Sequence, residues 1–135
     1  MRAPLGTTQS VTLTHCIRQG TSEHSYTVRL SRVSVHEVSG AAVSTPGFAR
    51  TGTTVLCIFP GWSTVVPEGA EAAQEAAGCF LSPEAFRGAE DAQRAAHWTL
   101  APEDKVQLPS GRVGTVTRVQ DNRTGRCPHW YVEVS

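Results

Sequence analysis

Two stretches of alternating apolar and polar residues, joined by a turn, constrain the fold of this chain more than any other feature. In residues 10–17 and 25–38, apolar side chains recur mostly at every second position. A period of two puts successive side chains on opposite faces of a strand. Residues 18–23 have the composition of a turn, so the sequence predicts an antiparallel hairpin. The expected inward-facing residues are Val11, Leu13, Ile17, Tyr26, Val28 and Leu30.

The second strand of this hairpin changes phase in its middle. Leu30 is followed by Ser31 and Arg32, after which the apolar alternation resumes at Val33 and Val35. Such a shift within one long strand predicts a β-bulge or a sharp bend.

The rest of the chain carries further short strand patterns. Residues 53–59 are strongly apolar, and residues 62–66 form a shorter pattern after a Pro-Gly corner. Late in the chain, alternating segments are separated by turns rich in Gly, Pro, Asp and Asn. We therefore expect a single domain over residues 1–135 that is mainly β, a small antiparallel β-barrel with a short helical insertion. Its six principal strands are expected at residues 11–17, 26–38, 53–59, 105–108, 112–120 and 129–134.

The helical insertion is expected over residues 67–97. Residues 67–77 are rich in Ala and Glu, which favours helix, and Gly78 suits a helix end. The Ser82-Pro83-Glu84 step predicts a second helix, because Ser caps a helix and Pro suits its first position. Gly88 is expected to end this helix, and residues 90–97 are expected to add another turn or two.

The charge balance and the chain start narrow the functional classes. The 135 residues include 12 Lys and Arg and 12 Asp and Glu, so the formal net charge is zero. A dedicated nucleic-acid binder needs a basic face, whereas a neutral surface makes self-association easier. The first residues form no apolar run and no window is long enough to span a bilayer, so a soluble protein made in the cytoplasm is expected, without a membrane partner.

Residues that carry chemistry are present but form no catalytic or metal-binding motif. His15-Cys16 and Cys127-Pro128-His129 are close pairs, yet no C-x-x-C knuckle is present, and Cys16 and Cys57 are expected to be ordinary buried thiols. The acidic pairs at 90–91 and 103–104 are interpreted as solvated surface. We expect no enzyme activity, no metal, no cofactor and no disulfide.

Two features are candidates for contact with partners. Residues 39–52 have no periodicity and read as a long loop, which in compact domains is typically functional or disordered. Trp62 follows the Pro-Gly corner and is a candidate partner contact, because aromatic residues are enriched in interface cores, whereas Trp98 and Trp130 are expected in the barrel core. The candidate channel or interface residues of the loop are Ser39, Gly40, Ser44, Thr45, Pro46, Gly47, Phe48 and Arg50.

One segment suggests an alternative function. Residues 104–116 read as strand, tight turn and strand, with Pro109 and Gly111 in the turn. This pattern resembles the KOW-type element of SH3-like barrels in ribosomal and transcription proteins, which contact RNA. The element lacks aromatic residues for base stacking and the net charge is zero, so an RNA- or protein-binding module is the second interpretation.

The order of features along the chain resembles the small head–tail joining proteins of long-tailed bacteriophages, the connector or head-completion group that includes stopper and minor capsid proteins. The likeness runs from the first hairpin to the end of the chain. It is carried by Val11-Thr12-Leu13, by the Phe80 to Phe86 helix start, by His97-Trp98-Thr99-Leu100, by Asp104-Lys105-Val106, and by residues 119–123.

This resemblance implies a structural protein of the virion neck. Copies of the chain would form a ring, commonly hexameric, between the portal or adaptor protein of the capsid and the tail proteins. A loop from each subunit, here residues 39–52, could help close the channel after DNA packaging. Contact with the packaged DNA would then be steric and independent of base sequence.

Overall fold

The computed structural model describes residue 4 and residues 6–37, 53–67 and 70–135, and in them a closed barrel of six antiparallel strands. Around the barrel the strands follow the order β1, β2, β3, β8, β7, β6 and back to β1. The expected fold class is confirmed. The barrel strands are β1 (Gln9–Gln19), β2 (Ser22–Glu37), β3 (Thr54–Ile58), β6 (Lys105–Gln107), β7 (Val113–Asp121) and β8 (Trp130–Val134).

The long strand β2 organises the barrel because it has different partners along its two edges. One edge pairs with β1 at residues 22–33. The other edge pairs with β4 (Thr64–Pro67) at residues 28–31 and with β3 at residues 34–37. The change occurs at Arg32, which is skipped by the register between β1 and β2 and has a φ of 58°. The predicted bulge is therefore confirmed. It bends β2 so that its two halves can join different sheets.

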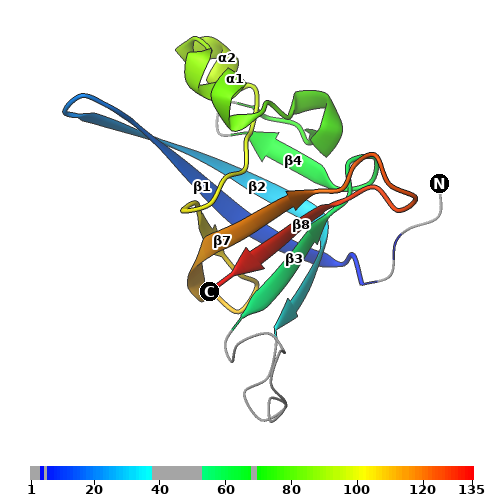
Figure 1. Ribbon diagram of the computed structural model, residues 1–135. Coiled ribbons are helices and arrows are strands. Elements are labelled where there is room, and N and C mark those ends of the chain that lie inside the picture. Colours follow the sequence, from blue (N-terminus) through cyan, green and yellow to red (C-terminus); the bar gives the residue numbers. More distant parts are fainter. Residues whose placement is uncertain (1–3, 5, 38–52, 68–69) are drawn as a thin grey trace.

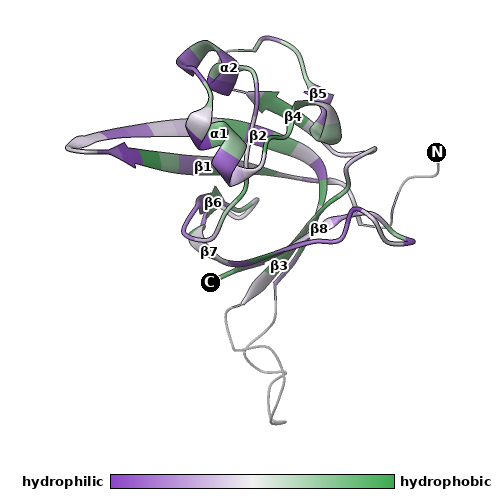
Figure 2. Cartoon of the chain, turned by 45° about the horizontal axis from the view of Figure 1, so that its top comes forward, coloured by the Kyte–Doolittle hydropathy of each residue, from purple (hydrophilic) through white to green (hydrophobic). Residues whose placement is uncertain are grey.

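The β1–β2 hairpin extends beyond the barrel as an arm (Figure 1). Strand β6 pairs with β1 only at residues 12–14, and β4 pairs with β2 only from residue 28 onwards. The tip closes through Gly20, which has a φ of 63°, in the left-handed region that glycine adopts without strain. Figure 2 shows pale or polar colour at this tip and apolar colour in the strands around the barrel interior.

The helical content is smaller than the sequence predicts. The expected helix over residues 67–77 is wrong: Pro67 ends β4, Gln74–Glu75 form the short strand β5 beside β4, and a 3-10 turn follows at Ala76–Cys79. Ala76 is fully buried, and its carbonyl accepts a hydrogen bond from the indole of Trp98 at 2.9 Å. Tertiary packing thus outweighs the intrinsic helix preference of the Ala-rich segment.

The other two predicted helices are present and lie over the base of the arm (Figure 1). Helix α1 (Pro83–Gly88) begins as expected, with the Ser82 hydroxyl accepting a hydrogen bond from the amide of Ala85 at 3.2 Å, and α2 (Asp91–Ala95) follows. The buried guanidinium of Arg94 donates to the carbonyls of Phe86 and Arg87 and to the hydroxyl of Tyr26. This one side chain therefore ties both helices to the hairpin. No helix in the described ranges is long and apolar enough to cross a membrane.

The barrel interior is closed by aromatic side chains. Trp98 and Trp130 are each 1% exposed, as expected, with ring centroids 5.2 Å apart, and Phe80 lies about equally close to both. Of the predicted inward-facing residues of the first hairpin, Val11, Leu13, Val28 and Leu30 lie in the barrel core. Ile17 is buried outside this core, and Tyr26 is half-buried against Phe86. Aromatic pairs in this edge-on geometry add to the stabilisation from burial.

Candidate functional site

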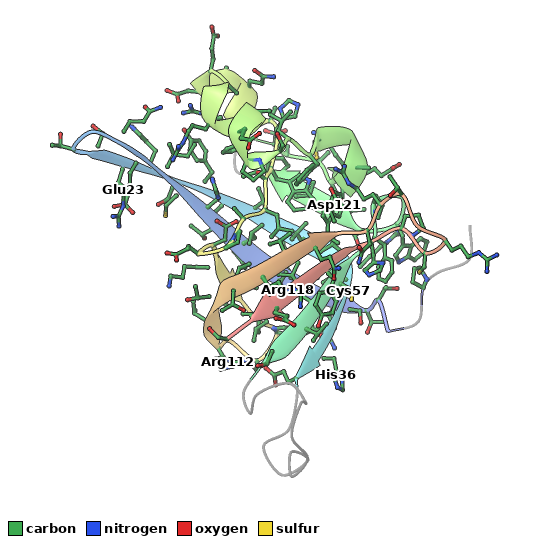
Figure 3. The ribbon with its side chains drawn as sticks, in the orientation of Figure 1. Glu23, His36, Cys57, Arg112, Arg118 and Asp121 are labelled. Atoms are coloured by element: carbon green, nitrogen blue, oxygen red, sulfur yellow. The ribbon has the colours of Figure 1, made fainter. Side chains whose placement is uncertain are left out.

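The candidate loop leaves the barrel at the end formed by β2, β3 and the turn before β7. Its residues 39–52 lie outside the described part of the chain, so the structure places none of the eight candidate residues. At the base of the loop, Glu37 pairs with Thr54 across the two strands. The guanidinium of Arg112 lies 2.8 Å from the Thr54 hydroxyl and 3.5 Å from the Glu37 carboxylate. Figure 3 shows Arg112 and His36 at this end of the barrel. These contacts fix the two points from which the loop starts.

Trp62, the other candidate contact, is engaged by its own chain. Its indole N–H donates to the Thr7 hydroxyl at 3.0 Å, and the Arg32 guanidinium lies 4.5 Å from the ring centroid. The neighbouring Ser63 is fully buried, accepts from the amide of Phe59 and donates to the carbonyl of Arg32. Trp62 and Ser63 after the Pro-Gly corner thus both contact Arg32, the bulged residue of β2. A half-buried face of Trp62 remains at the surface, and its partner role stays a prediction.

A hydrogen bond that local sequence patterns do not predict connects His15 on β1 to Asp104, in the segment before β6. His15 Nδ1 lies 2.6 Å from Asp104 Oδ1, and Asp104 Oδ2 accepts a hydrogen bond from the amide of Ala101 at 2.9 Å. Asp104 is 4% exposed, so its interpretation as solvated surface is wrong. An ionised carboxylate only accepts hydrogen bonds, so the geometry assigns the His15 proton to Nδ1.

Burial raises the pKa of Asp104 above its ordinary value of 3.8, against the opposing effect of the His15 hydrogen bond. The folded chain then holds the Asp104 proton more tightly than the unfolded chain does. The protonated carboxyl therefore stabilises the fold by its full amount at pH values below the pKa of Asp104 in the unfolded chain. This stabilisation is lost as the pH rises through the higher pKa of Asp104 in the folded chain. Asp104→Asn removes this titration.

We therefore compare the free energy of unfolding of the wild type with that of Asp104→Asn. The difference, wild type minus variant, should fall as the pH rises from about 3.8 through the raised pKa of Asp104 in the folded chain. Urea unfolding at a series of pH values measures this difference, and Glu103→Gln, a neutralised neighbour on the exposed surface, is the control. A difference that rises with pH would contradict the burial of an acid in this position.

The cysteines form no cross-links in the structure, where all four thiols are free. Cys16 is exposed, which corrects the expectation that it is buried, and Cys57 is half-buried. Burial raises the pKa of the Cys57 thiol, so this thiol is protonated at neutral pH. In the described part of the chain no group of three His, Cys, Asp or Glu residues could hold a metal ion.

A pocket of about 290 Å³ lies beside β7, at the end opposite the loop. Its floor includes Phe80 and Trp130, and the Arg123 guanidinium lies 4.9 Å and 4.8 Å from their ring centroids. The Arg123 guanidinium donates to both carboxylate oxygens of Asp121, and these hydrogen bonds keep the pKa of Asp121 below its usual range. The pocket also contains Leu100, Pro102 and Val119, so its wall is largely apolar.

The chain matches no protein-family model, no curated protein and no solved structure.

Only some of these contacts could be predicted from the sequence. The Pro-Gly corner at Trp62 follows from local pattern. The His15–Asp104 pair joins residues far apart in the chain, and Arg123 reaches aromatic rings that belong to other elements. The turn composition of residues 121–126 places Arg123 in the turn between the last two predicted strands, but it does not indicate these ring contacts.

Proposed function

We propose that this chain is a structural protein of a tailed-phage neck, where copies form a ring that joins the portal or adaptor side of the capsid to the tail. The order of sequence features that resembles the head–tail joining proteins supports this function. A closed antiparallel barrel is the architecture that the resemblance implies, and the chain has it.

The observation that carries the proposal is the length of the connection between β2 and β3. Glu37 and Thr54 are paired, and a connection of two to five residues commonly joins such strands. Residues 38–53 are far more than this geometry needs. Long connections in compact domains are usually functional or disordered, and the neck ring gives this one a function. In a ring, the small residues of this segment would let several copies approach one axis and help to close the DNA channel.

The charge of the chain is compatible with this role. The formal net charge is zero, so copies do not repel one another strongly, and DNA passing through the ring would not be held by a basic surface. Head-to-tail contacts that close on rotation produce rings. Six copies are the proposed number, on the resemblance alone. The test is a reconstruction of the particle neck, which should contain the chain as a closed ring.

An SH3-like RNA- or protein-binding module is the second candidate. One observation favours it: residues 105–107 and 113–115 do form a tight antiparallel pair, as the KOW-type pattern predicts. Trp98 and Trp130 are buried, however, so they are not available to stack on bases. Salt-dependent binding of the purified chain to single-stranded RNA would favour this candidate over the neck ring.

A further inference from the structure

The outer edge of β7 is an unpaired strand edge beside an apolar pocket. Strand β6 covers this edge only at residues 113–115, and the backbone of Val116 bonds to Glu103 and Asp104. Beyond that point no strand in the described ranges pairs with the outer side of β7. Barrels normally leave no free edges, because an unpaired edge is a template for another strand.

The hydrogen-bond pattern shows which backbone groups are free. Asn122 and His129 exchange backbone hydrogen bonds, at 2.9 Å and 3.4 Å. In an antiparallel pair such residues alternate with residues whose N–H and C=O point away from the partner strand. Val119 and Asp121 lie opposite Val132 and Trp130 at the alternate positions. Their backbone groups therefore point outward, away from β8.

The pocket lies on the inner side of this same edge. Val119 packs against the barrel core, and Val119 and Asp121 both line the 290 Å³ pocket together with Leu100 and Pro102 from the segment before β6. A strand added to β7 would place every second side chain on this inner side. Its apolar residues would enter the pocket, and its intervening residues would face solvent on the other side.

The charged residues on the solvent-facing side of β7 indicate which residue type suits the solvent-facing positions of an added strand. Arg118 is 60% exposed and makes one long ion pair, 3.9 Å, with Glu133. Arg123 lies at the far end of the pocket, where Asp121 already neutralises it. Figure 3 shows Arg118 and Asp121 along β7, far from Glu23 on the arm. Because Glu133 pairs with the exposed Arg118 guanidinium only at this long distance, Arg118 is available to acidic residues of an added strand.

We propose that the outer edge of β7 at Val119 and Asp121 is a docking site for an extended segment of a partner protein that alternates apolar and acidic residues. The main chain would supply hydrogen bonds, and the pocket would select the apolar side chains. This proposal depends on the proposed neck function only for the origin of the partner, which would be another protein of the neck. The arm of a second copy does not fit the pocket, since its exposed residues 18–25 are polar.

The test uses the full chain and the blocked peptide acetyl-Thr-Leu-Glu-Leu-Glu-Leu-Thr-amide. Amide spectra should shift at Val119 and Asp121 on titration, and these two amides should become protected from hydrogen exchange. Replacing each Glu of the peptide by Lys should weaken binding by about tenfold. Two further peptides carry N-methyl groups, one on the Leu amides and one on the Glu amides. One of them should lose binding and the other keep it, because only alternate amides face β7.

Two kinds of protein variant complete the test. Val119→Pro removes the outward amide while Arg118 and Gln120 still bond to β8, so it should weaken peptide binding by about tenfold or more. Where Val119→Pro fails to fold, Arg118→Glu should weaken binding and Arg29→Glu, an exposed arginine on β2, should not.

Three results would overturn the proposal. The first is equal binding of the Glu and Lys peptides, and the second is equal binding of the two N-methylated peptides. The third is protection of Val119 and Asp121 that depends on protein concentration without peptide, which would make a second copy the occupant. These outcomes are measured on the isolated chain, so they are independent of whether the chain is found in a phage neck.

Discussion

Replacing Trp98 by alanine is expected to lower the free energy of unfolding by about 3–5 kcal/mol, the range for large aromatic truncations in a core. Trp98 is 1% exposed and packs edge-on against Phe80 and Trp130. Its indole N–H donates to the carbonyl of Ala76, which would lose its partner. A small domain has only about 5–15 kcal/mol of stability in total, so the variant should be partly unfolded near physiological temperature.

Urea unfolding followed by circular dichroism measures this loss, and Trp62→Ala is the matched control. Trp62 is half-buried at the corner and makes one hydrogen bond to Thr7, so its truncation is expected to cost only about 1 kcal/mol. Equal losses in the two variants would mean that the aromatic cluster around Trp98 does not close the barrel.

Deleting residues 42–49 is expected to give capsids that fill with DNA and then lose it before tails attach. The remaining residues 38–41 and 50–53 are still longer than a tight hairpin needs, so β2 and β3 should keep their pairing. The barrel and the ring would therefore survive, while the segment proposed to close the channel is removed. The amount of DNA retained in heads isolated from a tailless background is the measurement.

Replacing residues 42–49 by the same number of Gly and Ser residues keeps the length of the segment and changes only its sequence. If closure is steric, this variant should retain DNA. Full retention of DNA by the deletion variant would remove the gating role and leave the ring untouched.

Local sequence patterns are sufficient to predict most strands of the barrel. The spacing from Leu30 to Val33 breaks the period of two, and the structure places a bulge at the intervening Arg32. The Ser82-Pro83 step likewise specifies a helix start through its own backbone chemistry. Both signals are contained within a few residues, so they can be read without knowing the partners of the segment.

The predictions that are wrong concern residues whose structure is decided by contacts with distant parts of the chain. Residues 67–77 have helical composition, but Gln74 and Glu75 pair with β4 and Ala76 is buried beneath Trp98. The acidic pair at 103–104 is typical of a surface turn, and only the pairing of the next segment with β1 places His15 beside the buried Asp104. The pocket beside β7 is likewise formed by elements that are separated in the chain, so no local motif predicts it.

The decisive measurement for the proposed neck ring is an electron cryomicroscopy reconstruction of the neck of the tailed particle that carries this chain. We expect a closed ring of copies related by rotation, six on the family resemblance, with barrels in head-to-tail contact and the β2–β3 connections directed toward the channel. A monomer in solution is compatible with this result, because the portal side can act as the template. A neck without the chain, or with an isolated copy that has no cyclic neighbours, would contradict it.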